Sequence, residues 1–179
     1  MRIIAGAWRG RTLLAPPGQG TRPTSDRARE ALFSMLQSRL GSFEGLEVAD
    51  PFAGTGALGL EALSRGAARC TFAETDRAAL DTLRRNAAAL GAGDRADIRS
   101  LDGTRLSGGP FHLVLMDPPY RSGLGARALA QMAEVGALAP GALISLETAR
   151  DEHPDFSAFE LLAERNYGKA RLRLLRWPG

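Results

Sequence analysis

The chain has 179 residues and a mass of 19.0 kDa, which is enough for one domain with its own buried core. Its content of 44% apolar and 24% charged residues is typical of a globular protein and excludes a disordered chain. The single cysteine, Cys70, excludes a disulfide framework, and two histidines are too few for a zinc site, so we expect no bound metal. No run of about 18 apolar residues is present and the N-terminus does not resemble a signal peptide, so we expect a cytoplasmic protein without a membrane helix.

Positive charge gathers at the two ends of the chain. The net charge is +3, and Lys169 is the only lysine among 23 basic residues. Six arginines lie in residues 1–31, and five cations without any acid lie in residues 165–176. Because guanidinium groups match phosphate oxygens bidentately, this distribution favours a polyanionic partner; a solvated surface is the simpler alternative.

The first 41 residues predict an extension that precedes the regular part of the chain. Short apolar pieces around Gly6 and Gly10 indicate a hairpin, and the prolines and glycines of residues 16–20 indicate a loop. Residues 24–26 offer N-cap side chains for a helix that runs to about Leu40, with apolar residues at helical spacing.

Strands and helices alternate from residue 46 onward. We predict strands over residues 46–50, 69–74, 96–101, 111–116 and 142–147, and helices over residues 57–64, 76–90 and 125–134. Thr75 or Asp76 is expected to cap the second of these helices, and Gly91 to end it. Residues 159–162 and 170–175 are expected to close the sheet as an antiparallel pair. The alternation predicts an α/β fold with a parallel sheet and right-handed crossovers.

A glycine pattern follows the first predicted strand. Gly54, Gly56 and Gly59 match the spacing G-x-G-x-x-G and lie between a strand and a helix. Glycine lets the backbone turn sharply and approach a ligand, and the helix N-terminus behind it offers free N–H groups. Glu74 ends the second strand, where a carboxylate can accept both hydroxyls of a ribose. Together these features predict an adenosine-containing cofactor; a tight turn that packs a helix on a strand is the alternative.

The glycine pattern does not choose the cofactor. NAD would place its pyrophosphate on this loop, whereas S-adenosylmethionine would place its methionine part beside it. Asp50 can accept from the ammonium group of that methionine or can cap the loop, and both interpretations stay open. Asp102 follows the third strand and can accept the adenine amine or form a plain turn.

The sequence Asp117-Pro118-Pro119-Tyr120 follows the strand predicted over residues 111–116. Because the carboxyl ends of parallel strands meet at one edge, we expect this turn beside the glycine loop. The two prolines stiffen the turn, and the Pro118 carbonyl, without a ladder partner, can point into the cleft.

Such a turn suits an exocyclic amine on a planar base. Asp117 and the Pro118 carbonyl would accept its two N–H groups and hold the nitrogen towards a tetrahedral shape, with its lone pair facing a sulfonium methyl group. Tyr120 offers a flat face for stacking. The alternative is that the prolines only end a strand and Tyr120 packs. The turn by itself would serve an adenine, cytosine or glutamine amine equally.

At these positions the chain resembles class I S-adenosylmethionine-dependent amino-methyltransferases. More narrowly, it resembles the RsmD-type family, which methylates the 2-amino group of a guanine in bacterial small-subunit ribosomal RNA. The match covers nearly the whole chain and includes residues 2–6 with 9–11, residues 22–27 with 29–33, residues 52–66 and residues 117–120. Pro51 departs from the family pattern, which has a larger aliphatic residue there, and we expect it to alter only the entry to the loop.

The resemblance implies a Rossmann-like fold with a seven-stranded, mostly parallel sheet and an antiparallel last strand. Residues 42–179 would form the methyltransferase domain, and residues 1–41 a hairpin and helix facing RNA. The residues implied to act in catalysis are Asp117, Pro118 and Tyr120. The residues implied to bind S-adenosylmethionine are Asp50, Phe52, Gly54, Thr55, Gly56, Glu74 and Asp102.

The implied substrate is ribosomal RNA within a small-subunit particle, bound by a monomer. The chain has no room for a separate DNA-recognition domain, so recognition is expected from the basic extension and the loop after Tyr120. The predicted RNA-binding residues are Arg9, Arg11, Arg22, Arg27 and Arg121. Three alternatives stay open: an amino-methyltransferase acting on DNA adenine or a protein amide, an oxidoreductase on the same nucleotide fold, and a catalytically silent RNA-binding module.

Overall fold

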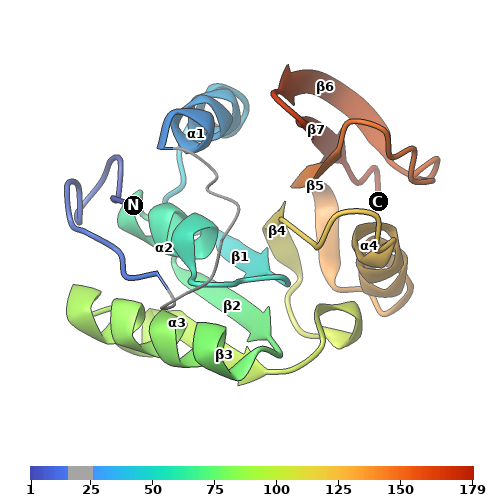
Figure 1. Cartoon of the computed structure of the whole chain (residues 1–179). Coiled ribbons are helices and arrows are strands. Elements are labelled where there is room, and N and C mark those ends of the chain that lie inside the picture. Colours follow the sequence, from blue (N-terminus) through green and yellow to red (C-terminus); the bar gives the residue numbers. More distant parts are fainter. Residues whose placement is uncertain (16–25) are drawn as a thin grey trace.

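The computed structural model describes residues 1–15 and 26–179, and over these residues the chain forms a seven-stranded sheet with helices on both faces (Figure 1). The strands are β1 (Glu47–Asp50), β2 (Arg69–Glu74), β3 (Ala96–Ser100), β4 (Phe111–Met116), β5 (Leu138–Ala149), β6 (Glu160–Tyr167) and β7 (Ala170–Arg176). The helices are α1 (Asp26–Leu40), α2 (Ala57–Ser64), α3 (Arg77–Leu90) and α4 (Leu124–Glu134), with short 3-10 turns at Gly93–Arg95 and Gly103–Arg105.

The order of strands in the sheet is β3-β2-β1-β4-β5-β7-β6. Strands β1 to β5 pair in parallel, and β7 pairs antiparallel with both β5 and β6. This arrangement confirms the predicted parallel sheet, the Rossmann-like class and the antiparallel closing pair. The chain reverses its direction across the sheet between β1 and β4, which is where open α/β sheets bind ligands.

The predicted caps of α3 are also confirmed. Asp76 is the N-cap residue, and its side chain accepts a hydrogen bond from the backbone N–H of Ala79 at 2.9 Å. Gly91 is the C-cap residue. The capping residues predicted for α1, Thr24 and Ser25, and the loop predicted over residues 16–20 lie outside the described residues.

Three boundaries differ from the prediction. Strand β5 begins at Leu138 rather than at residue 142. Leu138 already pairs with Phe111 of β4, and after a register shift across Pro140 the pairing continues from Leu143 with Leu113. Proline within a strand is found mainly at sheet edges and at bulges, so Pro140 made the sequence read as a loop there. Strand β6 continues to Tyr167, through polar, exposed residues that weaken the strand pattern. The two arms of the predicted N-terminal hairpin are joined by backbone hydrogen bonds, such as Ile3 N–H to the Arg11 carbonyl at 2.9 Å and Leu13 N–H to the Met1 carbonyl at 2.8 Å, but within residues 1–15 they form only one isolated bridge, between Arg2 and Thr12, and no regular strands.

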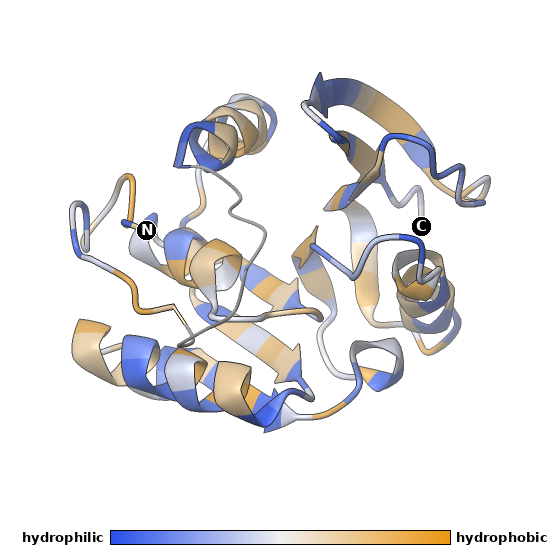
Figure 2. Cartoon of the chain, viewed as in Figure 1, coloured by the Kyte–Doolittle hydropathy of each residue, from blue (hydrophilic) through white to orange (hydrophobic). Residues whose placement is uncertain are grey.

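Two apolar layers enclose the sheet. On one face, α1, α2 and α3 pack on strand residues such as Phe72 and Leu113. On the other face, α4 packs on Val114 and Ile144. Figure 2 shows hydrophobic colours along β5 and alternating hydrophilic and hydrophobic colours along α3, as expected for a buried strand and a surface helix.

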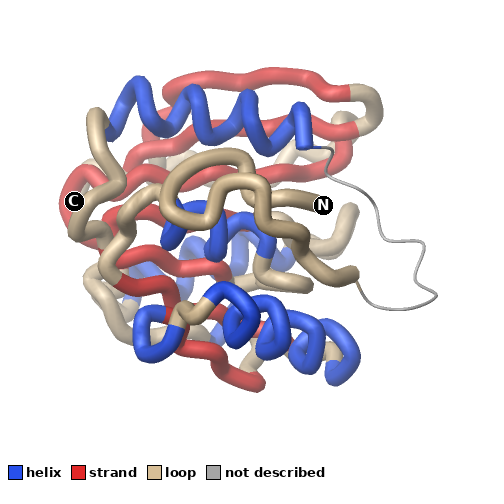
Figure 3. Tube along the Cα trace, turned by 90° about the vertical axis from the view of Figure 1, so that its left-hand side faces the viewer, coloured by secondary structure: helices blue, strands red, loops and turns tan. Residues whose placement is uncertain are grey.

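The N-terminal segment, residues 1–15, lies across the helical layer between α1 and α3 (Figures 1 and 3). Ile3 and Leu13 are buried in the same core cluster as the helices beneath them. Gly6 makes this close approach possible, since a Cβ atom there would lie 1.9 Å from the Ser64 carbonyl oxygen. The segment therefore shares its core with the sheet, while the predicted division of the chain at residue 41 stays a prediction.

None of the helices in these described stretches combines the length and apolar character needed to cross a membrane. In the same stretches, no three His, Cys, Asp or Glu side chains are grouped so that they could hold a metal ion. Cys70 is a buried free thiol. The polar groups that matter for chemistry lie at one edge of the sheet.

Candidate active site

A cavity of about 900 Å³ opens at the carboxyl ends of the parallel strands. One side is formed by the loops that follow β1, β2, β3 and β4. The other side is formed by the N-terminal segment and the first turn of α1, through Met1, Ala15, Asp26 and Arg29. The cavity has the size and the position in the fold that are typical of a small-molecule site.

The glycine loop after β1 forms the wall of the cavity. Phe52, Gly54 and Thr55 line it directly. Gly56 lies behind them as the N-cap residue of α2, with a φ of 88°. A Cβ atom at this position would lie 2.3 Å from Leu83 Cδ1 of α3, so conformation and space both require glycine there. The loop can therefore approach a ligand closely while α2 stays packed on its neighbours.

Asp50 lies at the end of β1 beneath the loop and is only 1% exposed. Its Oδ2 accepts a hydrogen bond from the backbone N–H of Gly59 at 3.0 Å, which is the predicted capping role. Its Oδ1 has no hydrogen-bond partner within the described chain. Burial raises the pKa of this carboxyl to about 8, and the nearby Asp117 and Glu74 carboxylates add to the shift. A donor such as an ammonium group would satisfy the remaining oxygen.

Glu74 connects the glycine loop to the turn before α3. Its Oε1 accepts from the Gly54 N–H at 2.8 Å, and its Oε2 accepts from the N–H groups of Thr75 and Asp76, each at 2.9 Å. A carboxylate has about four acceptor positions, so these three bonds leave one, on Oε1, for a ligand hydroxyl. We predicted that Glu74 accepts hydrogen bonds from two ribose hydroxyls. In this structure its carboxylate has a free acceptor position for only one.

Asp102 lines the cavity at the end of β3. Its Oδ1 accepts from the backbone N–H and the side-chain hydroxyl of Thr104, at 2.9 and 2.8 Å. The bond from the Thr104 backbone is the main reason that the pKa of Asp102 is below its usual value. The predicted turn is present, and Oδ2, which takes no part in it, is the atom that a ligand amine would meet.

The Asp117-Pro118-Pro119-Tyr120 turn leaves β4 at the same cavity. Asp117 and Pro119 line the cavity, Pro118 is buried, and Tyr120 is half-buried. Among the described hydrogen bonds, none is donated to the Pro118 carbonyl. The Tyr120 hydroxyl donates a long hydrogen bond of 3.4 Å to Oε1 of Glu147 at the end of β5. The fold thus brings the amine-binding turn predicted from the sequence to the glycine loop.

Arg9 and Arg11 lie on the opposite side of the molecule from the cavity. The neighbouring Trp8 N–H donates to Ser64 Oγ at 3.0 Å, and Arg11 Nη2 donates to the Ala89 carbonyl at 2.6 Å. Ser64 and Ala89 are at the C-terminal ends of α2 and α3, two helices that begin at the cavity. The contact of these two arginines with RNA stays a prediction, and it would have to be made at a distance from the cavity.

The other predicted RNA-binding arginines are distributed differently. Arg27 is exposed on the first turn of α1, next to the cavity-lining Asp26. Arg121 follows Tyr120 and pairs with Asp151 at 2.9 Å. Arg22 lies outside the described residues.

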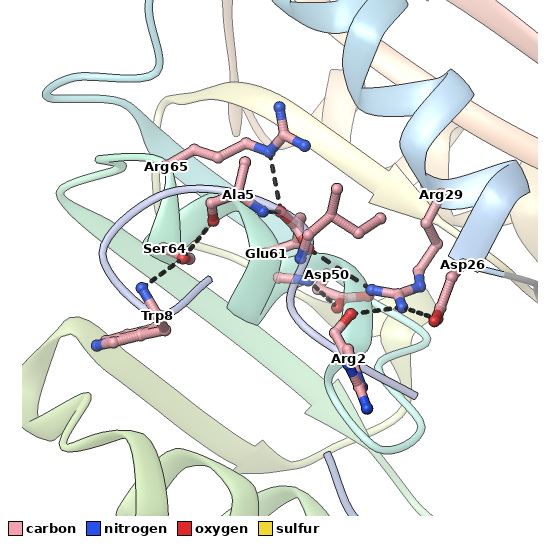
Figure 4. A network of polar contacts seen from close by, with 11 residues as sticks. Arg2, Ala5, Trp8, Asp26, Arg29, Asp50, Glu61, Ser64 and Arg65 are labelled. Carbon is pink, nitrogen blue, oxygen red and sulfur yellow. Dashed lines mark hydrogen bonds and ion pairs between the residues drawn. The ribbon is translucent and has the colours of Figure 1, made fainter. Parts of the chain in front are cut away.

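A buried cluster of charges on α2 was missed from the sequence (Figure 4). The Glu61 side chain is fully buried; its two oxygens accept from the backbone N–H groups of Ile4 and Ala5, at 2.8 and 3.1 Å. The same carboxylate pairs with Arg65 at 2.9 Å and with Arg29 at 3.6 Å. Glu61 therefore fastens the N-terminal segment to the helix. The signal in the sequence is a single acid within the apolar stretch 57–63.

Arg29 extends this cluster to the cavity. Its fully buried guanidinium donates from Nη2 to the Arg2 carbonyl at 2.7 Å and to Asp26 Oδ1 at 2.5 Å. Its Nε and Nη1 have no hydrogen-bond partner among the described residues. The arginine holds the first turn of α1 against the N-terminal segment, and so it shapes the outer wall of the cavity.

Comparison with known proteins gives consistent matches. The model of the family described as "Conserved hypothetical protein 95" matches residues 1–176. The Escherichia coli K12 protein named "Ribosomal RNA small subunit methyltransferase D" is 45% identical over 150 residues, which cover 83% of this chain and 74% of that protein. A protein of the same name from Haemophilus influenzae is 39% identical over 158 residues, covering 85% and 80%. The solved structure of yhhF from Escherichia coli matches with a TM-score of 0.87 and 36% identity, covering 100% of this chain and 98% of that one.

Proposed function

Because the chain belongs to the RsmD-type family of ribosomal RNA methyltransferases, we propose that it methylates the 2-amino group of a guanine in small-subunit ribosomal RNA, with S-adenosylmethionine as methyl donor. The observation that carries the proposal is the placement of the Asp117-Pro118-Pro119-Tyr120 turn on the same cavity as the glycine loop. The relatives' names support ribosomal RNA as the substrate. The choice of guanine and of its 2-amino group rests on the family resemblance of the motifs.

The acceptors left over around the cavity fit S-adenosylmethionine. Bound there, this cofactor supplies a methyl group on a positively charged sulfur. The unpaired Oδ1 of Asp50 would accept from its ammonium group, and the remaining position on Glu74 Oε1 from a ribose hydroxyl. Asp102 Oδ2 would accept from the adenine amine. Glu74 and Asp102 line the cavity at separate points, and Asp50 is buried beneath its glycine loop, so the three contacts would suit an extended ligand.

The turn after β4 would orient the amine that is methylated. An exocyclic amine is a poor nucleophile because its lone pair is delocalised into the ring. The Asp117 carboxylate and the Pro118 carbonyl would accept its two N–H groups and hold the nitrogen towards a tetrahedral shape. Held in this way, the nitrogen lone pair would form the bond to the methyl carbon, and the electron pair of the broken S–C bond would stay on sulfur. The nitrogen would then carry the positive charge and be acidic, so it could lose one proton to solvent without a strong base.

Tyr120 would hold the base itself. Its ring offers a stacking surface, worth about 1–3 kcal/mol per base, and its hydroxyl is directed by Glu147. A base in a stacked or paired region would have to be extruded first. The names of the relatives favour ribosomal RNA as the molecule that presents this base, and we propose that it does so within a small-subunit particle. We further propose that the enzyme acts as a monomer.

The direct test is methyl transfer to small ribosomal subunits that lack the modification. Purified protein and labelled S-adenosylmethionine should label the RNA, and nucleoside mass spectrometry should identify N2-methylguanosine at one position. Label in DNA adenine or in a protein amide instead of RNA would overturn the substrate assignment. Another methylated nucleoside in the RNA would overturn the choice of the 2-amino group alone.

Substitutions of Asp117 test the proposed catalysis. Asp117→Ala should lower kcat by about 10²- to 10³-fold, because one acceptor for the amine is lost. Asp117→Asn keeps an acceptor oxygen and should retain more activity than the alanine variant. Asp94→Ala removes an exposed carboxylate from the 3-10 turn Gly93–Arg95 and is the matched control, with wild-type activity expected. Undiminished transfer by Asp117→Ala would remove Asp117 from the mechanism.

A further inference from the structure

The turn between β6 and β7 lies at the same edge of the sheet as the cavity. Because β7 runs antiparallel to β5, its first residue pairs with the last residue of β5, Ala170 with Ala149. The next residue, Arg150, donates its backbone N–H to the Lys169 carbonyl at 2.9 Å and its Nη1 to the Gly168 carbonyl at 3.2 Å. Arg150 and Lys169 are therefore neighbours in space, although they are 19 positions apart in the sequence.

Two contacts bring this turn next to the proposed catalytic residues. Glu147, three residues before Arg150, accepts the hydrogen bond from Tyr120. Asp151, directly after Arg150, pairs with Arg121, which directly follows Tyr120. The chain on both sides of Arg150 is thus joined to the turn that would hold the target base.

The carboxylates around this turn are already engaged. Asp151 pairs with Arg121, and Glu152 accepts the Ala149 N–H at 2.6 Å. Glu164 pairs with Arg171 and with the buried Arg173, each at 3.4 Å. The ion pairs of the described residues join none of these three carboxylates to Arg150, Arg165 or Lys169.

Three exposed cations remain at the turn, and the ion pairs of the described residues include none of them. They are Arg150, Arg165 and Lys169. Arg165 is placed on β6 two residues before Tyr167, which pairs with the first residue of β7. The result is a local excess of positive charge beside the position of the target base.

We propose that Arg150, Arg165 and Lys169 bind backbone phosphates of the RNA that flanks the methylated base. The identity of the nucleic acid rests on the proposed function; the surface itself rests on the geometry. Arg121 was predicted from the sequence to bind RNA, but its charge is compensated by Asp151. We therefore assign the phosphate contacts to the three cations nearby that form no ion pair with the described residues. Arg9 and Arg11 lie at the far side of the molecule. The phosphate contacts are therefore expected at the C-terminal hairpin.

The test compares two double variants with the same change in net charge. Arg150→Gln with Lys169→Gln removes two cations at the hairpin, and Arg9→Gln with Arg11→Gln removes two at the far side. Binding of small-subunit RNA and of an unrelated structured RNA is measured over a series of salt concentrations. Phosphate contacts release counterions, so log K falls as log salt rises. Each lost contact makes this negative slope less steep by about one unit.

The hairpin variant should lose about two units of slope with both RNAs and bind at least about 10-fold more weakly at low salt. The far-side variant should keep the wild-type slope, a result that would count against the contact of Arg9 and Arg11 with RNA predicted from the sequence. Both variants should bind S-adenosylhomocysteine like wild type, which shows that they are folded. An unchanged slope in the hairpin variant, or an equal loss in the far-side variant, would overturn the inference.

Failure of the proposed function would look different. In that case the wild-type enzyme would not methylate small-subunit RNA at all. The salt slope with unrelated RNA would still report whether the hairpin binds phosphates, because this part of the affinity does not depend on sequence.

Discussion

Two buried carboxylates, Asp50 and Glu61, show how similar residues come to serve different purposes. Glu61 receives two backbone N–H groups and two arginines, so its charge is fully compensated. Asp50 receives one backbone N–H and keeps one oxygen without a partner. A buried acceptor without a donor is costly, and such atoms often mark the place of a ligand. Glu61 therefore supports the structure, and Asp50 is suited to binding.

Asp50 should make stability depend on pH. Its pKa is raised from 3.8 to about 8 in the folded protein. Between these values the folded state binds one proton more than the unfolded state, so the free energy of unfolding falls as the pH rises, by up to about 1.4 kcal/mol per unit. Asp50→Asn cannot titrate, and its stability should fall less between about pH 5 and 8. Urea unfolding over this range measures the difference; parallel pH profiles would contradict the prediction.

Tyr120 should act through its ring more than through its hydroxyl. Tyr120→Phe keeps the stacking surface and loses only the long bond to Glu147, so a small loss of activity is expected. Tyr120→Ala removes about 1–3 kcal/mol of stacking, which corresponds to roughly 5- to 150-fold in kcat/KM for RNA. S-adenosylhomocysteine binding by calorimetry should be unchanged in both variants. Equal activities of the two variants would show that stacking is not the role of this residue.

At the scale of elements, side chains replace a sheet ladder in holding the N-terminal segment. Residues 1–15 contain one isolated bridge, and side chains of three helices hold them: Glu61 and Ser64 of α2, Asn86 of α3 and Arg29 of α1. Glu61 accepts the N–H groups of Ile4 and Ala5, and Ser64 accepts that of Trp8. Because Met1 and Arg29 also line the cavity, the stability of this contact and the shape of the site are connected.

Removing Glu61 should loosen this contact. Glu61→Ala leaves the N–H groups of Ile4 and Ala5 without their acceptor and removes the ion-pair partner of the buried Arg29, so a loss of about 3–5 kcal/mol in the free energy of unfolding is expected. Glu30→Ala, which removes an exposed acid on α1, is the control and should change it little. Urea unfolding gives the magnitude, and hydrogen exchange at Ile4 and Ala5 shows its location. A loss below about 1 kcal/mol would mean that the cluster is not essential to stability.

At the scale of the whole molecule, the two sides at which the parallel strands end and begin carry different features. The loops after β1 to β4 and the turn between β6 and β7 meet at the edge that carries the cavity. The ends of α2 and α3 meet at the far side, where the N-terminal segment carries Arg9 and Arg11. Basic residues near both ends of the chain are therefore not equivalent in space.

Binding of the methyl donor should stabilise the whole domain. A ligand at about 100 times its Kd adds roughly 2.7 kcal/mol to the free energy of unfolding, which raises the Tm of a chain of this size by about 5–11 °C. S-adenosylmethionine should produce such a shift, and NAD at the same concentration should not. A thermal melt with each ligand measures it. A shift with NAD alone would favour the oxidoreductase alternative.

Much of the fold was predictable because its signals are local. The caps Asp76 and Gly91, the alternation of strands and helices and the glycine spacing each act within a few residues. The start of β5 at Leu138 was not predictable, since Pro140 and Gly141 look like a loop in the sequence. Pairing with β4 on either side of them overrides that local preference.

The candidate site divides in the same way. The sequence by itself determined the α/β class, the glycine loop with Glu74, and the Asp117-Pro118-Pro119-Tyr120 turn, because each is a short motif whose chemistry needs those residues at that spacing. Only the tertiary structure decided that Glu61 meets Ile4, that Arg121 is neutralised by Asp151, and that Arg150 lies beside Lys169. Those partners are 57, 30 and 19 residues apart. Their contacts arise from packing of whole elements, which no local pattern records.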